Sequence, residues 1–428
     1  MRDFGARSAD AAGLGEKVRA FYERHPYPPP VDDLERYRAR WGDRQRRRAD
    51  SCLFWPDEPY REDRSVLVAG CGTSQAAKYA LRWPQAQVIG IDVSATSVEK
   101  TQALKRKCSL DNLEVRQLQV ERATELGQRF EHVVCTGVLH HLPDPDAGLR
   151  ALRDVLAPNG AMHLMVYAPY GRAGVYLLQA YCRELGLGSS APEIRDLAAN
   201  IKALPQDHPL VPLLRNAPDF RDDAALADAL LNPQDRPYSV PELFDFIGRA
   251  GLQFGRWLRQ AAYLPQCGAL ATSPHQPLLA RLPARAQYAA MELFRGTMVR
   301  HSALMYRDDR PAGAQPIHFD DDAWLDYVPL RAPDTICVLE RLPTGAAAVL
   351  INQTHSYTDL YLPIDAQQKQ LFDAIDGERS IGEIARKQGN PDTARGLFEQ
   401  LWWYDQVVFE APRRRSLPSQ AKESAPWQ

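Results

Sequence analysis

The sequence predicts an α/β protein whose main sheet is parallel and wrapped by helices. From Ser65 to Ala168, short β-rich runs alternate with helical patterns, which is the rhythm of strands joined by crossover helices. The first of these runs leads into Gly70-Cys71-Gly72 and then into a helical pattern. Asp92 closes the next run. A strand, a glycine turn, a helix and a second strand ending in an acid are typical of nucleotide-binding sheets.

Composition limits the classes of function that remain open. A chain of 428 residues predicts two or three domains. Basic and acidic residues nearly cancel, 52 against 54, so no global field favours nucleic acid or a membrane surface. Apolar stretches such as Ala161–Ala168 are far shorter than the roughly 20 residues that span a bilayer. The first residues lack the apolar core of a signal peptide. We therefore expect a cytoplasmic protein without a membrane or nucleic-acid partner.

The cysteines point the same way. There are 7, an odd number, and they lie far apart without a Cys-x-x-Cys pair. This scatter argues against a disulfide framework and against a structural zinc site. We expect a reducing compartment and no metal.

The elements of the sheet can be placed from their patterns. A helix is expected over Ser94–Cys108, with Ser94 as N-cap, and another over Asp146–Leu156. Further along, Ser239–Ala250 is expected to be a capped helix, and Gln253–Leu264 to return as a strand. The strands of the parallel sheet are expected at Ser65–Ala69, Val88–Asp92, Leu113–Leu118, His132–Thr136 and Ala161–Tyr167.

The flanking segments differ in composition from the sheet region. A helix is predicted from about Gly15 to Arg24, and the prolines that follow forbid a helix through residues 26–30 and favour an extended or polyproline conformation. Residues 171–235 and 275–310 have helical patterns. The expected units are an N-terminal helical and proline-rich strap (1–64), a cofactor-binding sheet domain (65–270) with a helical insertion (171–235), a helical connector (271–316), a small α+β accessory domain (317–410) and a disordered tail (411–428).

The glycine turn carries the strongest chemical signal. Glycines permit a tight turn and a close backbone approach, and the helix that follows offers free N–H groups. A carboxylate at Asp92 can accept both hydroxyls of a ribose. A dinucleotide usually requires a third glycine, but Gln75 stands at that position. S-adenosylmethionine has no pyrophosphate and does not need it, so this cofactor is favoured over a dinucleotide.

Residues 65–170 resemble the class I S-adenosylmethionine-dependent methyltransferases. Val66–Gly72 resembles their glycine loop, Asp92 their ribose-binding acid, and Phe130–Leu142 their fourth strand with its loop. Leu156-Ala157-Pro158-Asn159-Gly160 resembles the turn before their fifth strand. The resemblance implies a Rossmann-like, seven-stranded sheet with a reversed final hairpin. It also implies S-adenosylmethionine as cofactor, with these binding residues: Gly70, Cys71, Gly72, Asp92, Val93, Gln119, Val120, Thr136 and Gly137.

Candidate residues for the transfer itself follow the strands. His140 and His141 come after the fourth strand, and either could act as a general base if the nucleophile carries a proton. Tyr167 and Tyr170 follow the fifth strand, on the expected substrate side. No Asp/Asn-Pro-Pro-Tyr/Phe motif follows the fourth strand, which argues against adenine-N6 and glutamine acceptors.

The N-terminal segment resembles a bacterial subset of these enzymes, through its Phe-Tyr...Pro-Tyr-Pro pattern. Tyr22 and Tyr27 could close over the cofactor, or the segment could be a stiff strap that packs on the core. The arginines between Arg36 and Arg48 could meet an acidic partner, but interleaved acids favour a solvated helix face.

Leu371–Ala385 reads as a helix, an Asp-Gly turn and a second helix capped by Ser380 and Glu383. It resembles small winged-helix modules that hold leader peptides. A helical lid or a dimerisation domain, and hence a homodimer, is the competing interpretation.

Together these observations predict a methyltransferase that acts on a protein or peptide side chain or on a small-molecule nucleophile. The alternative is a non-catalytic S-adenosylmethionine-binding scaffold that acts through its C-terminal module. The intact glycine loop and ribose acid favour the enzyme.

Overall fold

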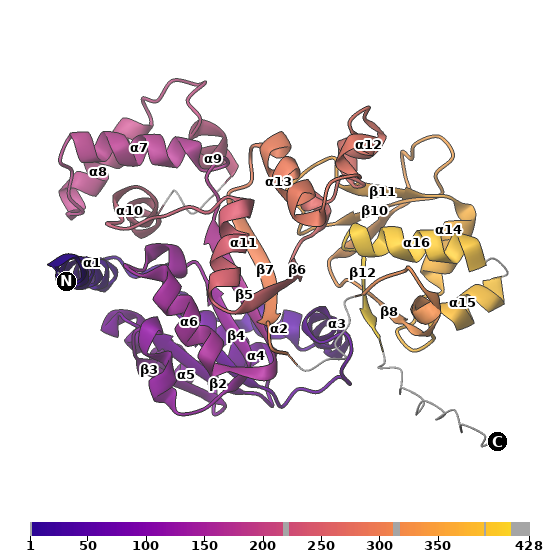
Figure 1. The fold of residues 1–428 in the computed structure, drawn as a ribbon, viewed down its shortest axis with the longest axis horizontal. Helices are drawn as coiled ribbons and strands as arrows, with labels where there is room; N and C mark the ends of the chain where they lie inside the picture. Colours follow the sequence, from indigo (N-terminus) through magenta and orange to yellow (C-terminus); the bar gives the residue numbers. More distant parts are fainter. Residues whose placement is uncertain (1, 217–221, 311–316, 389–390, 412–428) are drawn as a thin grey trace, which may run out of the picture.

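The computed structural model describes residues 2–216, 222–310, 317–388 and 391–411. A seven-stranded sheet lies at its centre, a helical insertion lies at one end, and a small C-terminal unit lies at the other (Figure 1). The predicted disordered tail lies, except for Ala411, outside the described residues. Among the described residues, no helix is long and apolar enough to cross a membrane.

The sheet has the strand order β3-β2-β1-β4-β5-β7-β6. The five strands β1 to β5 run parallel, whereas β7 runs antiparallel to both β5 and β6. All five predicted parallel strands are confirmed, and so is the reversed hairpin. The strands are β1 (Ser65–Ala69), β2 (Gln87–Asp92), β3 (Leu113–Gln117), β4 (Phe130–Thr136), β5 (Leu156–Tyr167), β6 (Leu252–Trp257) and β7 (Arg300–Arg307).

Alternating side chains of the strands fill two cores, one on each face of the sheet. Leu67 and Ala69 of β1 lie in one buried cluster, and Val66 and Val68 lie in the other, as the two-residue period of a strand requires. The first cluster includes residues of α6 (Pro145–Val155) and α11 (Val240–Arg249), and the second includes residues of α4 (Gln75–Arg82) and α5 (Ala95–Cys108).

The predicted caps of two of these helices are present. The Ser94 side chain accepts a hydrogen bond from the Ser97 backbone at the start of α5. Ser239 and Glu242 form a capping box at the start of α11. These local signals fix the points at which the chain leaves the edge of the sheet.

The prediction of helix through residues 275–310 is wrong at its end. This stretch contains α12 (Gln276–Leu279) and α13 (Ala284–Arg295), but Arg300–Arg307 forms β7, which lies between β5 and β6. The expected strand over Gln253–Leu264 is also shorter, because β6 ends at Trp257 and a 3-10 turn covers Ala261–Tyr263. The sheet therefore extends to residue 307, beyond the predicted boundary at 270.

The insertion is helical, as predicted, and it packs on the N-terminal strap. Phe21 of the strap lies in the same buried cluster as Val175, Leu210 and Leu226 of the insertion. In Figure 1, α1 lies directly beneath α10. The helices are α1 (Arg2–Arg24), α7 (Ala173–Glu184), α8 (Ala191–Ile201), α9 (Val211–Asn216) and α10 (Asp223–Leu231).

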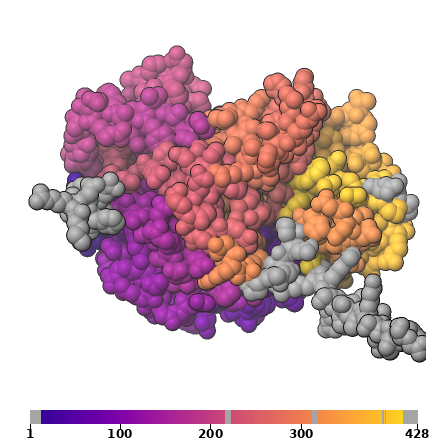
Figure 2. Space-filling view, viewed as in Figure 1, coloured from indigo at the N-terminus to yellow at the C-terminus, as the bar shows by residue number. Residues whose placement is uncertain are grey.

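The C-terminal unit combines a three-stranded sheet β11-β10-β9, a strand pair β12–β8 and three helices. In the space-filling view it lies at the opposite end of the molecule from the insertion (Figure 2). Its elements are β8 (Val328–Arg331), β9 (Thr335–Val338), β10 (Ala348–Asn352), β11 (Tyr361–Ile364), α14 (Ala366–Asp373), α15 (Ile381–Gln388), α16 (Pro391–Trp403) and β12 (Val407–Glu410).

The interpretation of the arginine run as a solvated helix face is wrong for several of its members. Arg48 makes two hydrogen bonds of 2.7 Å to the Glu410 carboxylate, and Arg40 and Arg46 both bind Asp334. These arginines belong to α2 (Glu35–Trp41) and α3 (Arg44–Phe54), whereas both acids belong to the C-terminal unit. The run therefore anchors that unit to the strap.

Candidate functional site

One large cavity, of about 1960 Å³, opens at the carboxyl ends of the parallel strands. This edge is where parallel α/β sheets bind their ligands. The strap, the glycine loop and the helical insertion all line the cavity, as does residue segment 354–360 of the C-terminal unit. The strap and the insertion therefore both contribute to the wall of the site.

Two glycines of the loop have backbone conformations that other residues rarely adopt. Gly70 has φ +67°, and a Cβ there would lie 2.3 Å from a Val138 methyl group. Gly72 has φ +52°, and its Cβ would lie 2.9 Å from the Tyr27 carbonyl oxygen and from Pro28. The loop therefore needs glycine for its turn, and at Gly72 also for the close approach of the strap.

Asp92 is held in a fixed orientation at the end of β2. Its Oδ2 accepts a hydrogen bond of 2.8 Å from the Gly72 backbone, and its Oδ1 accepts one of 2.9 Å from Ser94. Burial raises the pKa of Asp92. The carboxylate ties the glycine loop to the start of α5, and it lines the cavity.

The strap is fastened to the same helix start. Glu23 accepts hydrogen bonds from the backbone of Ala95 (2.7 Å) and Thr96 (3.0 Å) at the N-terminus of α5. Burial opposes ionisation, but the hydrogen bonds from Thr96 and Ala95 lower the pKa of Glu23. The Thr73 hydroxyl donates to the Pro28 carbonyl at 2.7 Å. These contacts fasten the segment that carries Tyr22 and Tyr27 to the glycine loop and to the start of α5.

A buried carboxylate on α10 faces the cavity. Asp228 is 3% exposed, and its Oδ1 accepts hydrogen bonds from Tyr22 (2.8 Å) and Asn232 (3.2 Å). Burial, together with the Asp228 charge, raises the pKa of Tyr22 well above its usual range. No Lys, Arg or His of the described chain forms an ion pair with Asp228, and its Oδ2 accepts no hydrogen bond from the described residues.

His140 and His141 have different surroundings. His141 lines the cavity, and its Nδ1 lies 2.6 Å from the Gln234 carbonyl oxygen. As the neutral ring, it would donate from Nδ1 and leave Nε2 as an acceptor. His140 is fully buried, does not line the cavity, and packs against the Tyr167 ring, with 4.0 Å between centroids and 36° between the ring planes. Burial and the charges of His141 and Arg172 lower the pKa of His140 well below its usual range.

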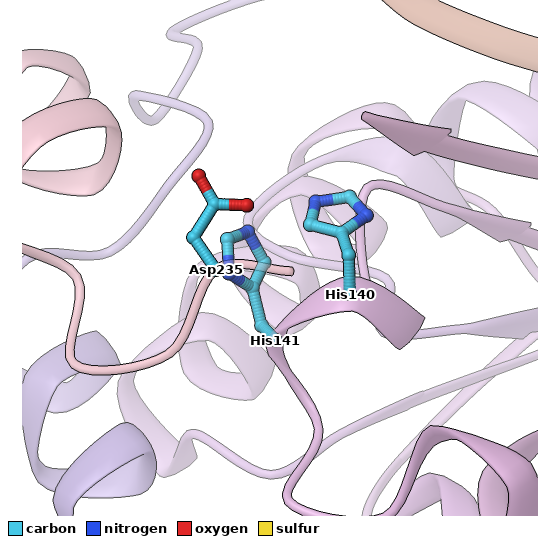
Figure 3. A group of neighbouring side chains, drawn as sticks. All are labelled: His140, His141 and Asp235. Carbon is cyan, nitrogen blue, oxygen red and sulfur yellow. The ribbon is translucent and has the colours of Figure 1, made fainter. Parts of the chain in front are cut away.

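Asp235 lies beside the two histidines, and the three side chains face one another (Figure 3). One potential ligand atom of each lies within 4.8 Å of the others, so the group has the composition of a metal site. However, Arg172 forms an ion pair with Asp235 at 3.2 Å, and both side chains are buried. This guanidinium already compensates the carboxylate, which weakens its attraction for a cation. The expectation of no metal stays a prediction.

Most of the residues singled out by the sequence lie together. All of them except His140 line the cavity: Tyr22, Tyr27, Gly70, Cys71, Gly72, Asp92, Val93, Gln119, Val120, Thr136, Gly137, His141, Tyr167 and Tyr170. Sequence reasoning missed Asp228 and Arg172, because a helical pattern does not show whether a charged side chain faces a ligand or solvent.

Comparisons with known proteins fit this geometry. A family model described as "Methyltransferase domain" matches residues 67–162. Residues 67–162 form a class I S-adenosylmethionine-dependent methyltransferase domain. An uncharacterised protein of Synechococcus sp., syc1184_c, is 32% identical over 251 residues, which cover 56% of this chain and 59% of the relative. Trans-aconitate 2-methyltransferase of Deinococcus radiodurans is 35% identical over 130 residues, 30% of this chain and 46% of the relative.

The methyltransferase domain is thus embedded in a longer chain, which spans about half the length of these curated relatives. Among solved structures, PKMT2 from Rickettsia typhi in complex with AdoHcy aligns with a TM-score of 0.60 and 18% identity. The alignment covers 90% of this chain and 77% of that one. At this identity the likeness shows the fold, and it extends over the flanking units as well as over the methyltransferase sheet.

Proposed function

We propose that the protein transfers a methyl group from S-adenosylmethionine to the side-chain amine of a lysine in a protein or peptide. The observation that carries this proposal is Asp228, a buried carboxylate without a cationic partner in the described chain, facing the cavity between two tyrosines. A buried charge without a partner is costly, and a cationic ligand compensates it.

The residues of the loop fit the cofactor. The Gly72 cradle is free of a side chain, Asp92 is oriented at the strand end, and the Gln75 side chain donates to the Thr136 hydroxyl at 2.5 Å. Together with Tyr22 and Tyr27, the residues that would hold it are Gly70, Cys71, Gly72, Asp92, Val93, Gln119, Val120, Thr136 and Gly137. When bound, S-adenosylmethionine supplies a methyl group that its sulfonium already activates. The chain therefore needs mainly to orient the acceptor and exclude water.

Asp228, Tyr22 and Tyr167 would orient the acceptor. The free Asp228 Oδ2 can accept a hydrogen bond from an ammonium, and the Tyr22 ring favours a cation at its face. The Tyr167 ring already has the Arg172 guanidinium over it at 3.6 Å, so it contributes its position and shape rather than a cation site. A protonated amine has no lone pair, so it must lose a proton before it reacts. We assign His141 Nε2, at the cavity wall, as the base that takes up this proton, which then passes to solvent. His140 would only position the Tyr167 ring.

Two further observations support a lysine in a protein or peptide as the methyl acceptor. The neighbour PKMT2 is a protein lysine methyltransferase, and its fold covers the strap, the insertion and the C-terminal unit of this chain. The cavity is also larger than a site for the cofactor alone requires, since ligand sites commonly measure about 300–1,000 Å³.

The test is a transfer assay with labelled S-adenosylmethionine and matched peptides that contain lysine, arginine or glutamate as the only candidate acceptor. We expect label on the lysine peptides, located at the amine by mass spectrometry. Asp228→Asn should lower kcat/KM for them by about 30-fold, or about 2 kcal/mol, with cofactor affinity within about twofold.

Asp223→Asn is the matched control, since Asp223 lies on the same helix and is exposed. Cofactor binding without transfer to any acceptor would favour the scaffold alternative. Transfer to carboxyl groups would overturn the amine assignment.

A further inference from the structure

A second part of the cavity lies away from the glycine loop, over the sheet. His163 and Met165 of β5 line it, and Met165 pairs with Ser302 of β7, which also lines it. On a strand, every second residue points to the same face, so His163, Met165 and Tyr167 share the face that looks into the cavity. We call the part around His163 the sheet chamber.

Four cationic side chains line the sheet chamber: Lys78 and Arg82 of α4, Arg259 after β6, and Arg300 at the start of β7. Lys78 and Arg82 are one helical turn apart and so lie on one face of α4. Burial, with the charges of Arg82, Arg259 and Arg300, lowers the pKa of His163 to about 3. All three of these arginines line the same cavity as His163.

The positive charge of the chamber is compensated only in part. Arg82 forms an ion pair with Asp50 at 3.4 Å. Lys78, Arg259 and Arg300 form no ion pair with any carboxylate of the described residues. Burial, without an opposing carboxylate, lowers the pKa of Lys78. The nearby acid Asp405 is already engaged by Arg256 (2.8 Å) and His355 (3.1 Å).

Polar groups of the C-terminal unit complete the wall. Arg259 donates its Nε–H to the Thr354 hydroxyl and an Nη1–H to the Leu258 carbonyl (2.9 Å), which fixes its guanidinium. The hydroxyls of Ser302 and Ser356 also line the cavity. Fixed cations among hydroxyl donors are the chemistry that binds a carboxylate or a phosphate.

We infer that the sheet chamber binds an oxyanion, a carboxylate or phosphate group, carried by the methyl acceptor. The assignment to the acceptor rests on the proposed function, whereas the binding of an anion rests on the chamber alone. Gln75, one turn before Lys78 on α4, donates to Thr136 at the cofactor end, so the chamber is continuous with the methyl-transfer site. An acceptor that reaches both ends would place its amine near Asp228 and an anionic group near Lys78 and Arg300.

The first experiment measures the binding of inorganic phosphate to the full chain by calorimetry, in a low-salt buffer without other oxyanions. We expect saturable binding, weakened tenfold or more by Lys78→Gln and by Arg300→Gln. Arg300 is exposed, so its variant should fold even if the Lys78 variant does not. Arg122→Gln is the matched control, because Arg122 is an exposed arginine paired with Glu125 outside the cavity, and it should change the Kd less than twofold.

An absence of saturable phosphate binding would overturn the inference, and so would equal weakening by all three variants. S-adenosylhomocysteine affinity is measured on each variant, and we expect it to stay within twofold.

The second experiment distinguishes the two sources of the anion and links it to the acceptor. Lysine peptides with a glutamate, a phosphoserine or an alanine at each of several spacings are compared as substrates. We expect at least one anionic peptide to have a kcat/KM tenfold above its alanine counterpart, and Lys78→Gln to remove that advantage. Equal kcat/KM for all peptides would overturn the link to the acceptor. Phosphate binding without any lysine methylation would overturn the proposed function and leave the chamber standing.

Discussion

The part of the cavity around Gly70, Gly72 and Asp92, here called the cofactor end, is continuous with the sheet chamber. The two parts differ in how far apart their residues lie along the sequence. Gly70, Gly72 and Asp92 come from one run of strand, turn, helix and strand. Asp92 binds the Gly72 backbone, and Gly72 lies against the strap. The chamber is assembled from Lys78, His163, Arg259, Arg300 and Thr354, which belong to five separate segments. The first arrangement can be recognised in a short motif. The second exists only once β7 and the C-terminal unit have been placed.

The two parts of the cavity should therefore also differ in which substitutions they tolerate. The cofactor end depends on backbone conformation, so a single added Cβ disrupts it. The chamber depends on charge and on the docking of a separate unit, so its loss should spare the cofactor. The following predictions test that separation.

The largest effect is expected at the joint that holds the chamber wall. The Asp405 carboxylate accepts hydrogen bonds from Arg256 (2.8 Å), the Ala261 backbone (3.1 Å) and His355 (3.1 Å), all in the interior. Asp405→Asn keeps the shape but leaves Arg256 buried without a counter-charge, which should cost about 3–5 kcal/mol of unfolding free energy. Chemical denaturation measures the free energy of unfolding of this variant, with the exposed Asp326→Asn as control. A loss below about 1 kcal/mol would mean that the unit docks by other contacts.

The second effect is expected at the glycine loop. Gly72→Val adds a branched side chain where a Cβ already lies 2.9 Å from the Tyr27 carbonyl and at φ +52°. We expect S-adenosylhomocysteine affinity to fall at least a hundredfold, by displacement of the strap as well as by occupation of the cradle. Gly248→Val is the control, since nothing lies within 4 Å of a Cβ there. Normal binding would refute the loop assignment.

The third effect is smaller and concerns the ribose acid. Asp92→Ala removes a carboxylate that can accept two hydroxyls, so cofactor affinity should fall by about 1.5–3 kcal/mol, or roughly 10- to 150-fold. Calorimetry with S-adenosylhomocysteine measures this loss, with the exposed Asp111→Ala as control. If the two variants bound equally well, Asp92 would serve only to tie the glycine loop to α5.

The sequence was informative about the parallel sheet and most of the cofactor end because those features are local. Ser65–Ala69 is a short apolar run, Gly72 starts a turn, and Ser94 is a cap, and each is recognisable within a few residues. By contrast, Arg300–Arg307 has no alternation of polar and apolar residues: three polar residues precede Ala303-Leu304-Met305, and the segment, which follows a helix, was predicted as helix. Its place between β5 and β6 depends on pairing with β5, which is far away in the sequence.

The same reasoning explains what remained hidden in the candidate site. Asp228 and Lys78 lie on helices whose patterns do not reveal which face meets a ligand. Arg48 and Glu410 are 362 residues apart, so the docking role of the arginine run could not be read from its composition. The winged-helix resemblance and the homodimer stay predictions.

A pH experiment sharpens the assignment of Asp92. Burial raises its pKa, so the carboxyl takes up a proton at a higher pH than an exposed aspartate, whose pKa is about 3.9. The protonated form loses the charge that favours the ribose hydroxyls. Cofactor affinity should therefore fall as the pH is lowered through the raised pKa of Asp92, at a higher pH than an exposed aspartate would give. Asp92→Asn should abolish this dependence, and an unchanged profile would assign the titration to another group.

The smallest effect is expected from a change that touches only the chamber. The Thr354 hydroxyl accepts the Arg259 Nε–H and donates to the Asn352 side-chain oxygen at 2.6 Å. The Thr354 backbone N–H donates to the same oxygen at 3.0 Å, so Thr354→Val keeps this second bond of the turn. Losing the hydrogen bond from Arg259 frees its guanidinium to move, and a net contribution of about 0.5–1 kcal/mol from that bond corresponds to a two- to fivefold weaker phosphate Kd. Thr124→Val, exposed and outside the cavity, is the matched control. Cofactor affinity should be unchanged in both variants, because nothing at the glycine loop contacts Thr354. If Thr354→Val instead weakened cofactor binding and left phosphate binding unchanged, the C-terminal unit would act on the cofactor end, and the two ends would not be separable.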